Sequence, residues 1–150
     1  MSDRAAGPSR GVHHARVEWA DTDAAGIHHN SAILRYAEAA EAALMRDSGV
    51  DGYFPVAPRV RLEVDFERPL TFGQEVTAVV ELERLGTSSM TFRFEIWAET
   101  GAGRPRGRAA FGRYVTVHVA GSHADGTARS TPWPDGWRRA LSPAAAAASD

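Results

Sequence analysis

The chain has 150 residues, of which 43% are hydrophobic and 24% are charged, and its formal net charge is −2. This balance is ordinary for a single globular domain, and the weak negative charge argues against nucleic acid as a partner. Cysteine is absent and all 17 basic residues are arginine, so disulfides, thiolate nucleophiles, cysteine metal sites and lysine Schiff bases are excluded.

Residues 1–11 are polar and contain glycine and proline, which predicts a flexible arm. They lack the apolar stretch of a signal peptide. No apolar run elsewhere approaches the roughly 20 residues that a membrane-spanning helix needs. We therefore expect a cytoplasmic protein without a membrane partner.

Residues 12–20 alternate between apolar and polar side chains, which is the period of a half-buried β-strand. The expected inner face of this strand carries His13, Ala15, Val17 and Trp19. The run 21–26 is rich in Asp, Ala and Gly, and it should end the strand in a turn.

Residues 30–48 follow a different period. Apolar and small side chains recur every three or four positions, which predicts one face of an α-helix. Asn30 or Ser31 would cap its N-terminus, and Gly49 suits the position just past its C-terminus. The many alanines favour the helix and add little bulk, so it can lie close against a sheet.

Residues 51–58 contain one glycine and two prolines and predict a loop. Four alternating segments follow it, at 60–67, 76–82, 90–96 and 111–119. On the last of these the expected apolar face is Phe111, Val115, Val117 and Val119. Short breaks between alternating segments favour antiparallel neighbours.

One long helix and a mainly antiparallel sheet of about five strands predict an α+β domain over 12–120. Beyond it, residues 121–150 lose the alternation and predict a tail. Trp133 and Trp137 would pack this tail on the domain, and its last residues should be disordered.

The stretch 17–30 holds the candidate catalytic groups. It places Asp21, Asp23 and Gly26 just before a helix N-terminus near Asn30. Unpaired N–H groups and a partial positive charge at a helix N-terminus can hold an oxyanion. A carboxylate beside them can act as a base or nucleophile, or it can merely form the turn and the cap.

This stretch resembles the signature of hotdog-fold acyl-CoA thioesterases of the 4-hydroxybenzoyl-CoA thioesterase kind. The matching positions are Trp19, Asp21, Asp23, Gly26, Arg35, Tyr36 and Glu38, followed by the segments 61–76 and 85–92. The resemblance extends over 12–119. It implies the hotdog fold, in which a sheet wraps around one long helix, and a homodimer or homotetramer with sites completed between subunits.

By the same resemblance, Asp23 is the catalytic carboxylate and the backbone N–H at Asn30 polarises the thioester carbonyl. Gly26 matches the glycine that lets the loop approach the ligand closely. The implied reaction is hydrolysis of an acyl-CoA or acyl-carrier-protein thioester, without a cofactor. Asp23 would either attack the carbonyl or activate water, and the sequence leaves both routes open.

The chain departs from the family pattern at His28-His29-Asn30 and at Ile33. His28 or His29 can contact the substrate, or each can be solvated or packed. Adjacent side chains in irregular backbone tend to point apart, so we expect no metal ion between them. A histidine acting as acid or base would instead favour a hotdog hydratase or dehydratase, and a non-catalytic acyl-CoA-binding protein is a third alternative.

Arginines cluster before and within the last predicted strand, at positions 104, 106, 108 and 113. The planar donor fork of arginine suits phosphate, and coenzyme A carries several phosphate charges. We therefore expect Arg108 and Arg113 to contact the CoA nucleotide. The alternative is a charged strand edge that resists aggregation.

Overall fold

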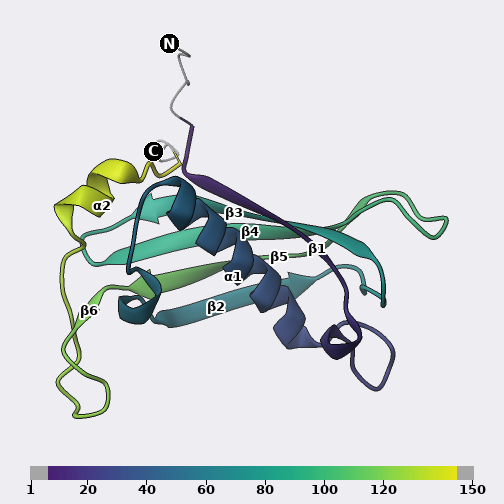
Figure 1. Ribbon diagram of the computed structural model, residues 1–150, viewed down its shortest axis with the longest axis horizontal. Coiled ribbons are helices and arrows are strands. Elements are labelled where there is room, and N and C mark those ends of the chain that lie inside the picture. The colour runs from purple at the N-terminus through teal and green to yellow at the C-terminus, as the bar shows by residue number, and fades with distance from the viewer. Residues whose placement is uncertain (1–6, 145–150) are drawn as a thin grey trace, which may run out of the picture.

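A computed structural model describes residues 7–144 of the chain (Figure 1). Its main elements are β1 (Arg10–Arg16), α1 (Asn30–Asp47), β2 (Arg59–Phe66), β3 (Glu75–Leu85), β4 (Ser89–Ala98) and β5 (Gly107–Val117). The strands form one antiparallel sheet in the order β1-β3-β4-β5-β2. The predicted α+β architecture, one long helix and five mainly antiparallel strands, is confirmed.

Helix α1 lies across one face of the sheet, and small residues let the two layers approach (Figure 1). Ala32, Ala37 and Ala40 are fully buried on this helix. A Cβ atom at Gly11 of β1 would lie 1.9 Å from the carbonyl oxygen of Ala40. The contact between β1 and α1 therefore requires a glycine on the strand.

The N-terminus of α1 differs from the prediction in its capping residue. His29, not Asn30 or Ser31, is the N-cap, and its ring Nδ1 accepts the N–H of Ser31 at 3.2 Å. The backbone of His29 is extended, which leaves its ring free to reach over the first turn. At the other end Gly49 follows the C-cap Ser48 with φ +71°, as the sequence indicated.

The first strand is shifted relative to its predicted range. It begins at Arg10, inside the expected arm, and it ends at Arg16. Trp19 then opens a short 3₁₀-helix (Trp19–Asp21) and is 78% exposed, so its predicted place in the core is wrong. The reciprocal cap between Glu18 and Asp21 turns the chain away from the sheet before Trp19 can pack. Of the rest of the expected arm, residues 7–9 are described and residues 1–6 lie outside the described residues.

On β5 the predicted apolar face is also wrong. The residues that face α1 include Ala110, Tyr114 and Thr116, all buried, whereas Phe111 and Val115 belong to the opposite face. Apolar side chains occur on both faces of this strand, so alternation alone did not identify the inner one. The buried hydroxyl of Thr116 lies 2.8 Å from the Tyr53 hydroxyl, with which it shares a hydrogen bond.

Strand β2 forms one edge of the sheet, and its apolar side chains are exposed. Val60 is 61%, Leu62 42% and Phe66 49% exposed. Leu62 and Phe66 pair with inner positions of β5, but α1 packs mainly over β1, β3 and β4. The edge strand therefore presents an uncovered apolar surface.

Further elements follow β5: β6 (Val119–Ala120) ends the predicted domain, and the predicted tail contains β7 (Arg129–Ser130) and α2 (Asp135–Ala140). Trp133 and Leu141 are buried against the domain. Residues 145–150, where disorder was expected, lie outside the described residues. Of the helices between residues 7 and 144, none has the length and apolar character needed to span a bilayer.

Candidate active site

Asp23 lies at the tip of the loop that joins β1 to α1. Its side chain is exposed, and its Oδ1 accepts the N–H of Ala25 at 2.8 Å. The turn is closed by a hydrogen bond from the Asp23 N–H to the Ile27 carbonyl (2.8 Å) and by one from the Gly26 N–H to the Asp23 carbonyl (3.0 Å). Gly26 has φ +79°, a conformation that glycine adopts without strain.

The first turn of α1 begins immediately after this loop. The N–H of Ser31 is capped by the His29 ring, and the N–H of Ala32 donates to the His29 carbonyl at 2.9 Å. Within residues 7–144 the backbone N–H of Asn30 has no hydrogen-bond partner. It is thus an available donor at the positive end of an 18-residue helix.

His28 is buried between the loop and the segment that follows β2. Its backbone N–H donates to the Leu70 carbonyl (2.8 Å), and its Nδ1 accepts the N–H of Leu70 (3.0 Å). Because Nδ1 is an acceptor, the neutral ring carries its proton on Nε2. Burial lowers the pKa of His28, against the nearby negative charge of Asp23. The ring also stacks on Phe66, with the centroids 5.7 Å apart.

His29 occupies a different environment. It is exposed at the helix cap, whereas His28 is enclosed beside Leu70. Over the described part of the chain, no three His, Asp or Glu side chains converge in a way that would hold a metal ion.

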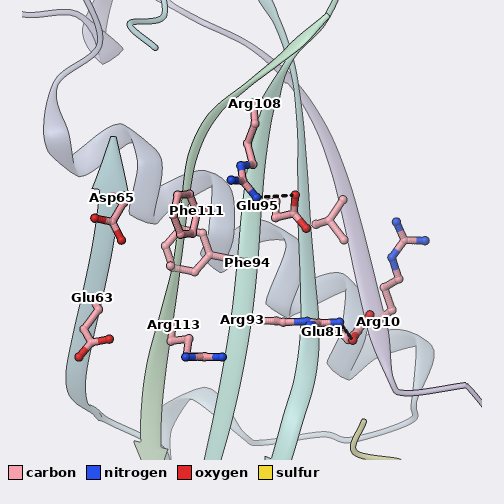
Figure 2. Close-up of a pocket in the computed structure, with 12 residues that line it drawn as sticks. Arg10, Glu63, Asp65, Glu81, Arg93, Phe94, Glu95, Arg108, Phe111 and Arg113 are labelled. Atoms are coloured by element: carbon pink, nitrogen blue, oxygen red, sulfur yellow. Dashed lines mark hydrogen bonds and ion pairs between the residues drawn. The ribbon is translucent and has the colours of Figure 1, made fainter. Parts of the chain in front are cut away.

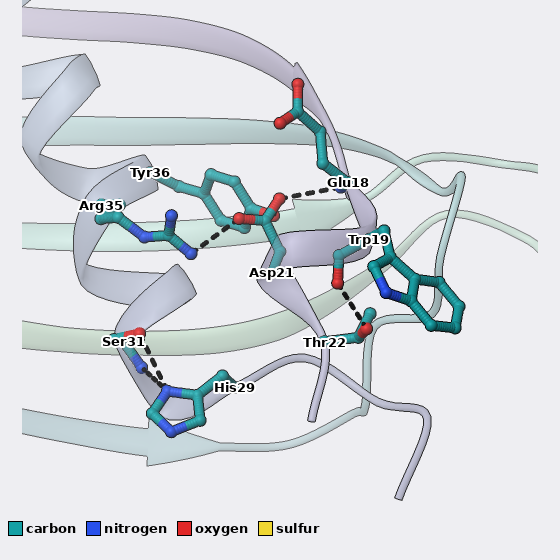
Figure 3. A network of polar contacts seen from close by, with 8 residues as sticks. All are labelled: Glu18, Trp19, Asp21, Thr22, His29, Ser31, Arg35 and Tyr36. Atoms are coloured by element: carbon teal, nitrogen blue, oxygen red, sulfur yellow. Dashed lines mark hydrogen bonds and ion pairs between the residues drawn. The ribbon is translucent and has the colours of Figure 1, made fainter. Parts of the chain in front are cut away.

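A polar network surrounds Asp21, and the sequence analysis did not predict it (Figure 3). This carboxylate is 6% exposed and accepts hydrogen bonds from Arg35, Tyr36 and the N–H of Glu18. Burial opposes its ionisation, but the three donors and the charge of Arg35 hold the pKa of Asp21 below its ordinary value. The signal in the sequence was the Arg-Tyr pair on the second turn of the helix, which can face a loop carboxylate.

Arg108 and Arg113 lie on the face of the sheet opposite α1, where they line a shallow cavity of about 550 Å³ (Figure 2). Arg108 pairs with Glu67 at 2.6 Å and with Glu95 at 3.5 Å. Arg113 pairs with Glu83 at 2.8 Å. The structure therefore does not bring these arginines together with the loop of Asp23, and their contact with phosphate stays a prediction.

Comparison with known proteins shows which family the sequence matches. The model of the thioesterase superfamily matches residues 25–103, which is more than half of the chain. The match begins after Asp23, so it carries no information about that residue. No curated protein matches the sequence.

Solved structures of several thioesterases are similar to this chain. The 4-hydroxybenzoyl-CoA thioesterase from Pseudomonas sp. strain CBS-3 has a TM-score of 0.78 at 16% identity, covering 89% of this chain and 99% of its own. A 1,4-dihydroxy-2-naphthoyl-CoA thioesterase from Synechocystis has a TM-score of 0.73 at 18% identity, with coverages of 87% and 94%. A predicted thioesterase from Bacillus stearothermophilus reaches 27% identity, with a TM-score of 0.71 and coverages of 88% and 93%. The hotdog fold expected from the sequence is thereby confirmed.

Proposed function

Since the chain belongs to the thioesterase superfamily and is a thioester hydrolase, we propose that Asp23 and the N-terminus of α1 form its catalytic centre. One observation carries this proposal: an exposed carboxylate, that of Asp23, lies in the loop that leads into α1, and the first N–H of that helix, at Asn30, has no hydrogen-bond partner among residues 7–144. Thioester hydrolysis needs a base or nucleophile and a donor for the developing oxyanion. These two groups supply both requirements.

Two routes are open to Asp23. As a general base it takes a proton from water, whose oxygen attacks the carbonyl carbon while the oxyanion faces the N–H of Asn30. As a nucleophile its oxygen attacks that carbon directly, and water then hydrolyses the acyl anhydride. In either case the carbon–sulfur bond breaks and the thiolate of the carrier leaves. Asp23 Oδ2 accepts no hydrogen bond from residues 7–144, which leaves it free for either role.

The neighbouring residues have supporting roles in the proposal. Gly26 allows the loop to close tightly, and His29 caps the helix by accepting the N–H of Ser31. His28 keeps its Nε2–H as a donor that a substrate can use. We propose acyl-CoA as the substrate, with an acyl-carrier-protein thioester as the other possibility within the same chemistry.

The test is Asp23→Asn, which preserves size and the turn but removes charge and basicity. We expect kcat for acyl-CoA hydrolysis to fall by roughly 10²-fold or more, the usual order for a positioned general base. KM and the melting temperature should change little. A panel of aromatic, short-chain and long-chain acyl-CoAs with a thiol reagent identifies the substrate for this measurement.

Asp125→Asn is the matched control, because Asp125 is also exposed and also accepts an N–H two residues ahead, that of Thr127 at 2.9 Å. Its turnover should equal that of the wild type. Near-normal turnover in Asp23→Asn would refute the assignment. Hydration of crotonyl-CoA without thiol release would instead indicate the hydratase alternative.

A further inference from the structure

The buried carboxylate of Asp21 lies two residues before the exposed carboxylate of Asp23. Its Oδ1 accepts from the Arg35 guanidinium at 2.7 Å. Its Oδ2 accepts from the Tyr36 hydroxyl at 2.9 Å and from the Glu18 N–H at 2.8 Å (Figure 3). The side chain thus connects the end of the first strand to the second turn of α1.

The backbone of Asp21 extends this connection to the helix cap. Its carbonyl accepts the N–H of His29 at 2.6 Å, and its N–H donates to the Glu18 carbonyl at 2.9 Å. Asp23, in contrast, is exposed and is held by hydrogen bonds within its own turn. The position of Asp23 relative to the N–H of Asn30 therefore depends on how firmly Asp21 is held.

We propose that Asp21, anchored by Tyr36, is a positioning residue that sets Asp23 against the N-terminus of α1 for thioester hydrolysis. This inference rests on the function proposed above. Asp21 acts through the loop, because it is 6% exposed and both its oxygens are occupied by protein donors. Misplacement of a reacting group by about 1 Å can cost on the order of 10²-fold in rate, so an anchor of this kind affects turnover.

The charges around the anchor keep it intact at neutral pH. Burial and the hydrogen bond to Asp21 raise the pKa of Tyr36, so its hydroxyl stays protonated and donates. The guanidinium of Arg35 is half exposed, and it contributes less to the anchor than the buried Tyr36 does.

The experiment removes only the Tyr36 hydroxyl, with Tyr36→Phe, and leaves the ring in the core. We expect kcat for hydrolysis of the acyl-CoA substrate to fall about tenfold, while KM changes by less than about twofold. Amide hydrogen exchange at Asp23 and His29 should accelerate about tenfold, the order expected for one lost buried hydrogen bond. The exchange measurement requires no turnover.

Tyr53→Phe is the matched control. It also removes a buried tyrosine hydroxyl that donates to a carboxylate, Glu41 at 3.0 Å, but on the second half of α1. It should lower the melting temperature as Tyr36→Phe does, with kcat and loop exchange unchanged. If Tyr36→Phe also lowers only the melting temperature, Asp21 is merely structural and the proposal is overturned.

Asp23→Asn separates the two proposals. If it loses turnover while Tyr36→Phe retains both turnover and slow loop exchange, the positioning role fails and the proposed function stands. If Asp23→Asn retains turnover while Tyr36→Phe loses it, Asp23 is not the catalytic carboxylate, and Asp21 does not act by positioning it.

Discussion

The side chain of His28, in the candidate site, makes the stability of the folded chain depend on pH. Burial lowers its pKa below the ordinary 6.5, although Asp23 opposes the shift. The unfolded chain therefore binds this proton more readily than the folded chain does. The neutral ring of His28 therefore contributes its full stabilisation of the folded chain above about pH 6.5. This stabilisation is lost as the pH falls through the lower pKa that His28 has in the folded chain.

We expect the melting temperature of the wild type to fall between about pH 7 and about pH 5, and that of His28→Gln to fall less. Glutamine keeps an oxygen that can accept the N–H of Leu70 but does not titrate. His123→Gln, at an exposed position of the tail, should retain the wild-type pH dependence. Equal slopes for the wild type and His28→Gln would contradict this assignment.

The arginines on the outer face give a second prediction at the scale of the residue. If Arg108 and Arg113 bind the CoA nucleotide, alanine at either position raises KM for acyl-CoA more than KM for a pantetheine thioester, which lacks those phosphates. Arg16→Ala serves as the control, because Arg16 is also an exposed arginine in an ion pair, with Glu75 at 2.7 Å, but does not line the cavity on the outer face. Steady-state kinetics on the two substrates decide the question, and equal effects on both would make the ion pairs structural.

At the scale of the element, the segment that follows β7 is part of the domain. Trp133 is 2% exposed, and its ring stacks on His118 with centroids 5.0 Å apart and on Tyr53 at 6.0 Å. The backbone N–H of Trp133 donates to the carbonyl of Thr87, in the connection between β3 and β4, at 3.0 Å. The tail therefore covers the end of the sheet near that connection.

We expect Trp133→Ala to reduce the free energy of unfolding by about 3–5 kcal/mol, the usual cost of emptying a large aromatic site. Truncation after Pro143 should leave folding and turnover unchanged, because within the described residues it removes only the hydrogen bond from Ala144 to the Leu82 carbonyl. Denaturant unfolding of both variants tests this. A truncation as damaging as Trp133→Ala would show that the final residues also dock.

At the scale of the whole molecule, the uncovered edge strand supports the prediction of a homodimer or larger homo-oligomer. Within residues 7–144, β2 pairs only with β5, so its other edge has unsatisfied backbone groups. The exposed Val60, Leu62 and Phe66 lie along the same strand. A second copy of β2, running antiparallel, would cover both features.

The charges on β2 select one register for such a pair. Arg61 and Glu63 lie on the same face of the strand, two positions apart. If Leu62 meets Leu62 of the second copy on the twofold axis, each Arg61 faces Glu63 across the interface. Shifting the axis to position 61 or 63 brings like charges together instead.

We therefore expect Arg61→Glu and Glu63→Arg each to weaken the dimer, and the double swap to restore it. Each single variant places like charges opposite one another, whereas the double swap recovers opposite charges. Sedimentation at micromolar concentration measures the effect. A fully active wild-type monomer would remove the oligomer prediction, and a double swap no tighter than the single variants would remove the register.

The sequence by itself determined the element order, the antiparallel sheet and the place of the loop before α1. These features are local, because a period of two or 3.6 residues and the glycine at position 26 depend on neighbouring positions alone. The same locality placed Asp23 beside a helix N-terminus. The family's motif spacing then singled out Asp23 and Asn30 from the chain's other polar residues.

Only the tertiary structure decided which environments these residues meet. The burial of Asp21 depends on Tyr36, which lies fifteen positions further along the chain. Helix α1 packs against the sheet so that the Tyr36 hydroxyl reaches the Asp21 carboxylate. The inner face of β5 depends on which side α1 covers, and the apolar residues on both faces of that strand hid it from the sequence. Burial is a property of distant segments packed together, so periodicity located the strands and the helix, and packing alone assigned their faces.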